Sequence, residues 1–167
     1  MTDIRSLLCA LVCGALVATN AGAVDVGERA PSFALPTAAG DSVSLEHMRG
    51  RVVYVDFWAS WCGPCRRSFP WMNEMQRRYG GKGLSIVASN VDKKRADAAR
   101  FLSEMSAEFI VVYDAPGAIP AAYAVQGMPS SYLIDPGGNV VAVEQGFRDQ
   151  SPAALEEKIR ALIASRR

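Results

Sequence analysis

Apolar runs of strand length alternate along this chain with stretches of helical periodicity. The strand-like runs cover residues 52–58, 84–89, 109–113, 131–134 and 140–144. The helix-like stretches cover residues 64–79, 94–106 and 152–165. A turn sequence at residues 135–139, Asp-Pro-Gly-Gly-Asn, joins the last two strands, so we expect those two to pair antiparallel. This order predicts an α/β fold in which helices flank a central mixed β-sheet.

The composition indicates one domain. The chain has 167 residues, of which 50% are hydrophobic and 21% charged, enough for one well-buried core and too few for two ordinary domains. With 18 basic and 17 acidic residues, the formal net charge is +1. Nucleic-acid binding requires a basic surplus, so we expect no nucleic acid among the partners.

The first residues have the pattern of a secretory signal. An apolar run at 7–18 follows Arg5, and Ala21-Gly22-Ala23 has the small-residue pattern of a signal-peptidase site. We expect residues 1–23 to be a signal peptide and residues 24–167 to be the mature domain, located in the periplasm or another extracytoplasmic space. The basic region before the run is weak, so an uncleaved anchor stays open, although the run is short for a membrane span of about 20 residues.

Two cysteines separated by two residues follow the first strand. In Trp61-Cys62-Gly63-Pro64-Cys65 the thiols lie one helical turn apart. Gly63 and Pro64 favour the start of a helix, because proline's missing N–H costs nothing in a first turn. Cys62 then lies at the helix N-terminus, where free amides and the helix dipole stabilise a thiolate. We predict a redox-active disulfide in which Cys62 is the attacking nucleophile and Cys65 the resolving thiol.

Half of a zinc site and a structural disulfide are the other uses of such a pair. Zinc needs four ligands, and the chain adds only Cys9, Cys13 and His47. The first two lie in the apolar N-terminal run, and we expect His47 to be an exposed bystander. A disulfide across three residues closes too small a loop to stabilise much. The prediction is therefore redox chemistry with no metal and no cofactor.

Three motifs resemble the thioredoxin fold and, more narrowly, the TlpA/ResA family of exported thiol:disulfide oxidoreductases. They are VDFWASWCGPC at residues 55–65, GMPSSYLID at 127–135 and GERAPSFALP at 27–36. The last is similar to an entry segment that TlpA-like proteins share with peroxiredoxins. The resemblance implies a thioredoxin-like fold with an N-terminal strand extension. Ser68 departs from it, because ResA-like members usually carry a glutamate at that position.

Asp56 is a single acid inside the apolar run 52–58. An ionised carboxylate there is costly without a partner. One interpretation is a partly exposed residue of an edge strand. The other, which we favour, is a buried carboxyl with a raised pKa that accepts the proton of Cys65 as this thiol attacks. By resemblance Asp56 is the thioredoxin-type acid.

The segment around Pro129 is expected to complete the site. X-Pro bonds are the ordinary place for a cis peptide, and the resemblance implies a cis bond at Pro129, beside Cys62. It also implies that the Met128 backbone pairs with an extended substrate segment as an added strand.

Aromatic residues crowd the motif. We expect Trp58 and Phe69 in the core, whereas Trp61 borders the nucleophile and belongs to an exposed apolar docking surface. The resemblance assigns Gly63 and Pro64 to the same substrate-binding surface.

These features predict a monomeric thiol-disulfide oxidoreductase, acting mainly as a reductase of disulfides in exported proteins. The substrate could be a cytochrome c apoprotein awaiting haem attachment, with a membrane thiol donor of the DsbD/CcdA type supplying electrons. Gly-Pro between the cysteines favours reduction by analogy with reducing thioredoxins. A disulfide oxidase or isomerase is the alternative within the class. A peroxiredoxin-like peroxidase is more distant, because Val55 and Ala59 stand where its proline and its threonine or serine are expected, and a binding module with incidental cysteines is a third alternative.

Overall fold

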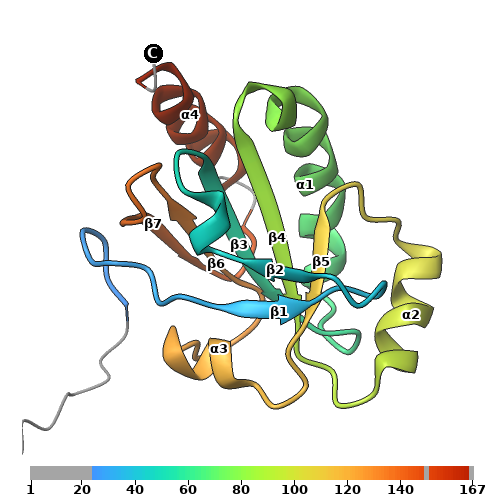
Figure 1. Cartoon of the computed structure of the whole chain (residues 1–167). Helices are drawn as coiled ribbons and strands as arrows, with labels where there is room; N and C mark the ends of the chain where they lie inside the picture. Colours follow the sequence, from blue (N-terminus) through green and yellow to red (C-terminus); the bar gives the residue numbers. More distant parts are fainter. Residues whose placement is uncertain (1–23, 149–150, 166–167) are drawn as a thin grey trace, which may run out of the picture.

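The computed structural model describes residues 24–148 and 151–165 of the chain. At its centre is a five-stranded sheet in the order β5-β4-β3-β6-β7 (Figure 1). The strands are β3 (Val52–Trp58), β4 (Leu84–Asn90), β5 (Ile110–Tyr113), β6 (Ser130–Ile134) and β7 (Val140–Gln145). β3, β4 and β5 run parallel, whereas β6 pairs antiparallel with both β3 and β7. The predicted mixed sheet and the antiparallel pairing of its last two strands are confirmed.

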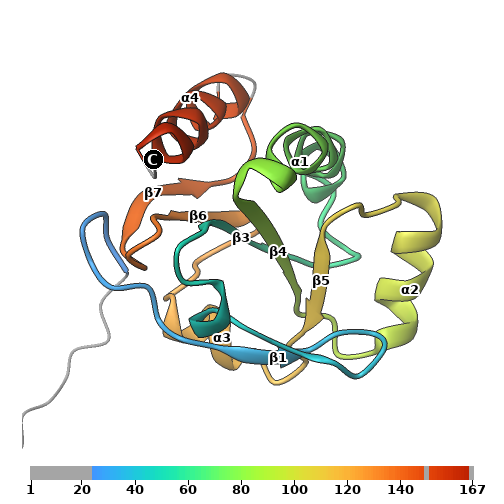
Figure 2. The same cartoon turned by 45° about the horizontal axis from the view of Figure 1, so that its top comes forward.

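Helices and an N-terminal hairpin cover the two faces of this sheet (Figure 2). α1 (Cys65–Tyr79) and α4 (Ser151–Ala164) lie on one face, and α2 (Arg95–Glu104) lies at the β5 edge. α3 (Ala118–Ala122) and the antiparallel hairpin of β1 (Ala34–Pro36) and β2 (Ser42–Ser44) cover the other face. Two short 3-10 helices are η1 (Glu46–Met48) and η2 (Gly80–Lys82).

Every residue of β3 is buried, because the strand lies in the middle of the sheet with both faces covered. Successive side chains point to opposite faces. Tyr54 and Trp58 join the core cluster under α1, whereas Val55 and Phe57 join the cluster under α3 and the hairpin. The same alternation places Asp56 on the α1 face.

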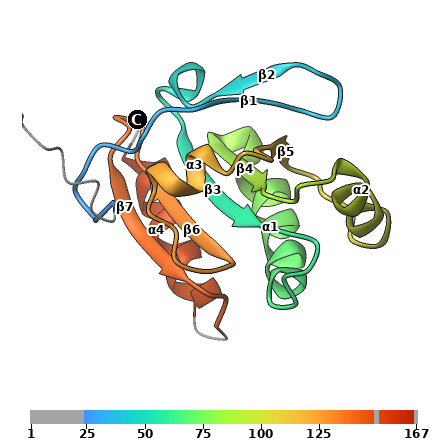
Figure 3. The ribbon, with the colours of Figure 1, turned by 90° about the horizontal axis from the view of Figure 1, so that it is seen from below.

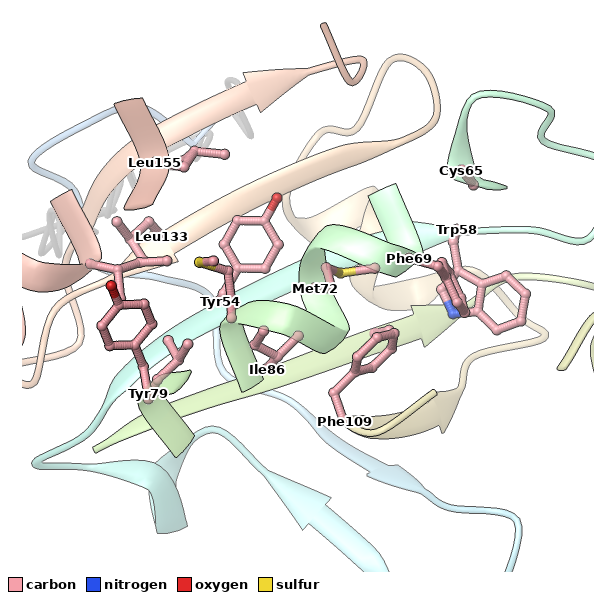
Figure 4. Packing of buried hydrophobic residues seen from close by; sticks show 14 of the residues in the cluster. Tyr54, Trp58, Cys65, Phe69, Met72, Tyr79, Ile86, Phe109, Leu133 and Leu155 are labelled. Atoms are coloured by element: carbon pink, nitrogen blue, oxygen red, sulfur yellow. The ribbon is translucent and has the colours of Figure 1, made fainter. Parts of the chain in front are cut away.

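The core beneath α1 is built around aromatic rings (Figure 4). The Phe69 ring centroid lies 5.0 Å from that of Trp58 and 5.0 Å from that of Phe101, both in edge-to-face geometry. Trp58 and Phe69 are fully buried, as predicted. Burying one large apolar side chain stabilises a fold by roughly 1.5–3 kcal/mol. These rings therefore fix the first turns of α1 against the end of β3.

The N-terminal region is described from residue 24 on. The signal peptide predicted for residues 1–23 lies outside the described residues. From Gly27 the chain runs beside the start of β7, where the Gly27 N–H donates to the Val140 carbonyl and the Val140 N–H donates to the Glu28 carbonyl, both at 2.8 Å. Within residues 24–148 and 151–165, no helix combines the length and apolar character needed to span a bilayer.

Candidate active site

The loop between β3 and α1, residues 59–64, carries the first cysteine of the predicted pair. Cys62 and Cys65 form a disulfide, with their Cα atoms 5.4 Å apart. The Cys65 N–H points back at Cys62, 3.2 Å from both its carbonyl oxygen and its Sγ. A backbone amide aimed at the Cys62 sulfur stabilises negative charge there once the disulfide is reduced. This loop is called the redox loop below.

The active-site helix begins one residue later than predicted. Pro64 occupies the N-cap position and α1 starts at Cys65, so Cys62 lies in the turn that leads into the helix. The amides of Arg66 and Arg67 bond to the Gly63 and Pro64 carbonyls. The first turn of α1 contains no acidic residue, so no carboxylate there opposes a thiolate at this end of the helix.

Exposure differs sharply across the motif. Trp61 is 71% exposed, the value expected of a docking residue, and Gly63 and Pro64 are also exposed. Cys62 is only 4% exposed and Cys65 is 0% exposed. A partner approaching this loop therefore meets Trp61 and the Gly-Pro turn first, and of the two cysteines only Cys62 has exposed surface.

Asp92, just beyond β4, holds the redox loop in place. Its carboxylate accepts bonds from the Ser60 N–H at 3.0 Å and the Ser60 hydroxyl at 3.0 Å. Asn90 donates its side-chain amide to the same carboxylate at 2.8 Å and accepts from the Asp92 N–H. Since Asp92 is 5% exposed, these bonds are largely shielded from water. The role of Asp92 could not be predicted from the sequence, because the residue stands in a polar run that is typical of a solvated turn.

Asp56 is buried, with 1% of its surface exposed. The interpretation as a partly exposed edge residue is therefore wrong, because β3 is the central strand. Burial raises the pKa of Asp56 well above its ordinary value. Its Oδ2 has no hydrogen-bond partner, and the residues opposite it on the neighbouring strands are Ala88 and Ser131, neither of them cationic. Burial thus favours the protonated form of Asp56, and its Oδ2 is available for proton transfer because it has no partner.

Tyr54 and Ser131 add a polar contact on the same face of the sheet. The Tyr54 hydroxyl donates to Ser131 Oγ at 2.7 Å. Burial raises the pKa of Tyr54 well above its ordinary value, and the negative charge of Asp56 adds to the shift. The phenol therefore stays protonated and acts as a fixed dipole near Asp56. This pair could not be predicted from the sequence, because its two residues come from strands far apart in the chain.

The Met128–Pro129 peptide bond is cis, as the resemblance implies. The Pro129 carbonyl accepts the Gly146 N–H at 2.7 Å, which ties this segment to the end of β7. Met128 is half-buried against the core cluster that contains both cysteines. Neither the N–H nor the carbonyl of Met128 is hydrogen-bonded within the described part of the chain, so both can pair with an incoming strand.

The chain matches known proteins along most of its length. The sequence profile of the Redoxin family matches residues 25–159. A thiol-disulfide oxidoreductase ResA of Bacillus thuringiensis subsp. konkukian (strain 97-27) is 30% identical over 165 residues, covering 95% of this chain and 94% of that protein. This chain belongs to the ResA-like thiol-disulfide oxidoreductases of the Redoxin family. The ResA of Bacillus subtilis (strain 168) is 33% identical over 147 residues, or 87% of this chain and 82% of that protein.

A solved structure supports the same assignment. A Chlorobium tepidum protein described as a thiol:disulfide interchange protein DsbE is 51% identical to the ResA-like chain, with a TM-score of 0.81. The match covers 84% of this chain and 99% of that protein. The predictions of a thioredoxin-like fold and of an enzyme of thiol-disulfide chemistry are confirmed.

Ser68 distinguishes this ResA-like chain from the glutamate pattern noted above. The Ser68 side chain is buried, and its hydroxyl donates to the Cys65 carbonyl at 3.0 Å within α1. A serine in this position adds no ionisable group next to the cysteines. Among the residues described, Asp56 is accordingly the buried carboxyl of this site that has an oxygen without a hydrogen-bond partner, whereas Asp92 is fully bonded.

No set of three metal-ligating side chains comes together within residues 24–148 and 151–165. His47 lies exposed in η1, as expected.

Proposed function

We propose that this ResA-like enzyme acts mainly as a reductase of disulfides in exported proteins. The observation that carries the proposal is that one site contains both the cysteine pair at the start of α1 and the buried Asp56 on β3, the strand that leads into the redox loop. The Cys62 sulfur receives a helix-terminal amide, whereas beneath α1 a buried carboxyl has an oxygen without a partner. Each step of disulfide reduction has a residue suited to it in this arrangement.

The first step is the attack of the Cys62 thiolate on one sulfur of a substrate disulfide. A bond forms between Cys62 and that sulfur, the substrate S–S bond breaks, and the other substrate sulfur leaves as a thiolate that takes a proton from water. The exposed Trp61 and the free backbone of Met128 hold the substrate segment while this mixed disulfide exists.

The second step resolves the mixed disulfide. The Cys65 thiol gives its proton, through water, to an ionised Asp56 and attacks the Cys62 sulfur. The Cys62–Cys65 disulfide forms, the bond between Cys62 and the substrate sulfur breaks, and that sulfur leaves as a thiolate that takes a proton from water. The substrate then has both cysteines reduced. Two electrons have passed from the enzyme to the substrate. A raised pKa makes Asp56 a stronger base towards a thiol than an ordinary carboxylate is.

The partners and location follow from the same proposal. Residues 1–23 direct export, cleaved or kept as an anchor, and the enzyme works in the periplasm or an equivalent space. A membrane thiol donor of the DsbD/CcdA type returns the enzyme to the dithiol form. Its substrates are exported proteins with paired cysteines, and cytochrome c apoproteins are the ones proposed. The support is the export-like N-terminus and the likeness to proteins named ResA and DsbE.

The equilibrium reduction potential of the Cys62–Cys65 pair, measured in glutathione buffers, tests the direction of electron flow. We expect a value near the roughly −270 mV of thioredoxin, which makes the dithiol form a reductant. A value near roughly −120 mV would make the enzyme an oxidase and overturn the proposal. Cys62→Ser, which removes the nucleophile, is the control: it should abolish disulfide reduction, and a biological function that survives this change would indicate a binding module instead.

A further inference from the structure

The edge of the sheet that carries the redox loop gathers segments from across the chain. Residues 59–64, 91–94 and 114–117 follow the parallel strands β3, β4 and β5, so they lie at the same edge. Residues 124–129 precede the antiparallel β6 and 146–148 follow β7, which places them there too. Figure 3 shows the molecule from this side, with the starts of α1 and α2 beside the connections around α3.

Exposed charge at this redox edge is almost entirely positive. The edge segments and the first turns of α1 and α2 carry six exposed cationic side chains: Arg66, Arg67, Lys93, Lys94, Arg95 and Arg148. Arg66 is ion-paired with Glu104 at 2.8 Å, and the other five have no ion pair among the described residues. The whole chain carries a net charge of only +1, so carboxylates elsewhere on the molecule offset this surplus. The positive charge is therefore a local property of the redox edge.

The carboxylates of the same segments are buried or ion-paired. Asp92 is buried and bonded to Ser60, as described above. Asp114 is 2% exposed and accepts the N–H groups at the start of α3, among them that of Ile119 at 2.7 Å. Asp97 is paired with Arg100 on its own helix. None of these acids presents an unpaired charge to a partner, whereas the Lys94 ammonium and the Arg148 guanidinium have no hydrogen bond or ion pair among the described residues.

An apolar centre lies within this positive surface. Trp61 is 71% exposed beside Cys62, and the exposed Pro64 lies between the two cysteines in the sequence. The half-buried Met128 packs against the core cluster that contains both cysteines. A polypeptide that reaches the disulfide therefore contacts an exposed aromatic side chain surrounded by cationic side chains.

We propose that the redox edge selects protein segments in which carboxylates flank the reacting disulfide. This rests on the proposed function and names the substrate class for it. Oppositely charged surfaces speed encounter and set orientation, and their effect falls with ionic strength. An anionic membrane has the same sign of charge, but a bilayer lying against Trp61 would cover the disulfide, whereas an acidic segment delivers a sulfur to Cys62.

The experiment compares three synthetic peptides that share one internal disulfide and carry glutamates, lysines or neutral glutamines beside the cysteines. The rate constant for oxidation of the full-length reduced enzyme by each peptide is measured at low and at high salt. We expect the acidic peptide to react at least about fivefold faster than the neutral one at low salt, and the basic peptide to react more slowly than either. High salt should bring the three rates together.

Two charge-reversed double variants locate the effect. Lys94→Glu with Arg148→Glu alters two side chains on separate segments of the redox edge, neither of which supports the fold through a described contact. Lys82→Glu with Lys158→Glu makes the same change of charge on η2 and in the middle of α4. The first variant should lose or invert the preference for the acidic peptide and keep its rate with the neutral one. The second should behave like the unaltered enzyme.

The outcomes separate this inference from the reductase proposal. Equal rates with all three peptides at low salt, or a preference that survives Lys94→Glu with Arg148→Glu, would overturn the inference and leave the reductase function standing. If the reduced enzyme reacts with none of them, the dithiol forms of the same peptides are offered to the oxidised enzyme, so the preference is tested even if the reductase function fails. Sedimentation with anionic phosphatidylglycerol vesicles that is lost in the Lys94→Glu, Arg148→Glu variant, without a peptide preference, would assign the surface to a membrane instead.

Discussion

Both faces of the central sheet are buried, but they differ in whether their buried polar groups have hydrogen-bond partners. On the face under α3 and the hairpin, the Tyr123 hydroxyl donates to the Pro31 carbonyl at 2.9 Å, and the Tyr132 hydroxyl donates to the Tyr123 carbonyl at 2.9 Å. On the α1 face, Asp56 Oδ2, Trp58 Nε1 and Trp71 Nε1 are buried without partners.

The difference shows where this fold tolerates unfavourable burial. A buried polar group without a hydrogen bond costs stability, so proteins normally satisfy nearly all of them. Among the described residues, the α1 face keeps a carboxyl in that condition on β3, the strand that leads into the redox loop. On the opposite side, the unpartnered atoms are neutral hydroxyls, those of Ser89 on β4 and of Thr37 in the hairpin. The hydrogen-bonded tyrosines under α3 and the hairpin therefore contribute to stability. On the α1 face, the unpartnered Asp56 costs stability and is available for proton transfer.

Phe57 and Asp56 are neighbours on β3 that test this division, because they point to opposite faces. Phe57 is fully buried, with its ring 5.3 Å from that of Tyr123 and 6.0 Å from that of Tyr132. Phe57→Ala should reduce the free energy of unfolding by about 3–5 kcal/mol in urea denaturation of the oxidised protein. The reduction potential should move by less than about 30 mV, and a larger shift would show that the two faces are coupled.

Asp56→Asn should instead slow one step of disulfide reduction. Without a proton acceptor, release of the mixed disulfide should slow by roughly 10²-fold, since general base catalysis of this kind contributes at least that much. Formation of the mixed disulfide should change little, because Cys62 attacks without Asp56. Stopped-flow kinetics with single turnovers separates the two steps, and equal slowing of both would contradict the assigned role.

The same substitution should also alter the pH dependence of stability. The pKa of Asp56 is raised in the folded state, so its contribution is fully present below the unfolded-state pKa and is lost as pH rises through the folded-state pKa. The oxidised wild-type enzyme should therefore lose stability relative to Asp56→Asn with rising pH, by roughly 1–3 kcal/mol at the alkaline end. Urea denaturation across a pH series measures the difference. A gap that stays constant with pH would mean that Asp56 is not protonated in the fold.

Local sequence patterns predicted most of the architecture. The run 52–58 coincides with β3 because a central strand needs apolar residues on both faces. The Gly-Pro pair and the helical periodicity of residues 64–79 predicted α1 to within one residue, and the position of Asp56 inside an apolar strand predicted its burial correctly. In these cases the residues that determine the structure are close to one another in the sequence.

Residues whose role depends on distant partners escaped prediction. Asp92 follows a strand and precedes two lysines, and only its bonds to Ser60, 32 residues earlier in the sequence, explain its burial. Tyr54 and Ser131 meet across strands that are 77 residues apart. The positive redox edge likewise arises because strand order brings separate loops together. A count of charges along the chain does not contain that information.

The segment that begins at Gly27 has a consequence for self-association. β7 is an outer strand of the sheet, and such strands offer free N–H and carbonyl groups to any passing chain. Residues 27–30 occupy those groups at the start of β7, with the Ala30 N–H bonded to the Gly138 carbonyl at 3.0 Å and Val140 paired in both directions. The N-terminal extension therefore shields part of this border from aggregation, and a version shortened beyond residue 30 would expose a template for intermolecular β-pairing.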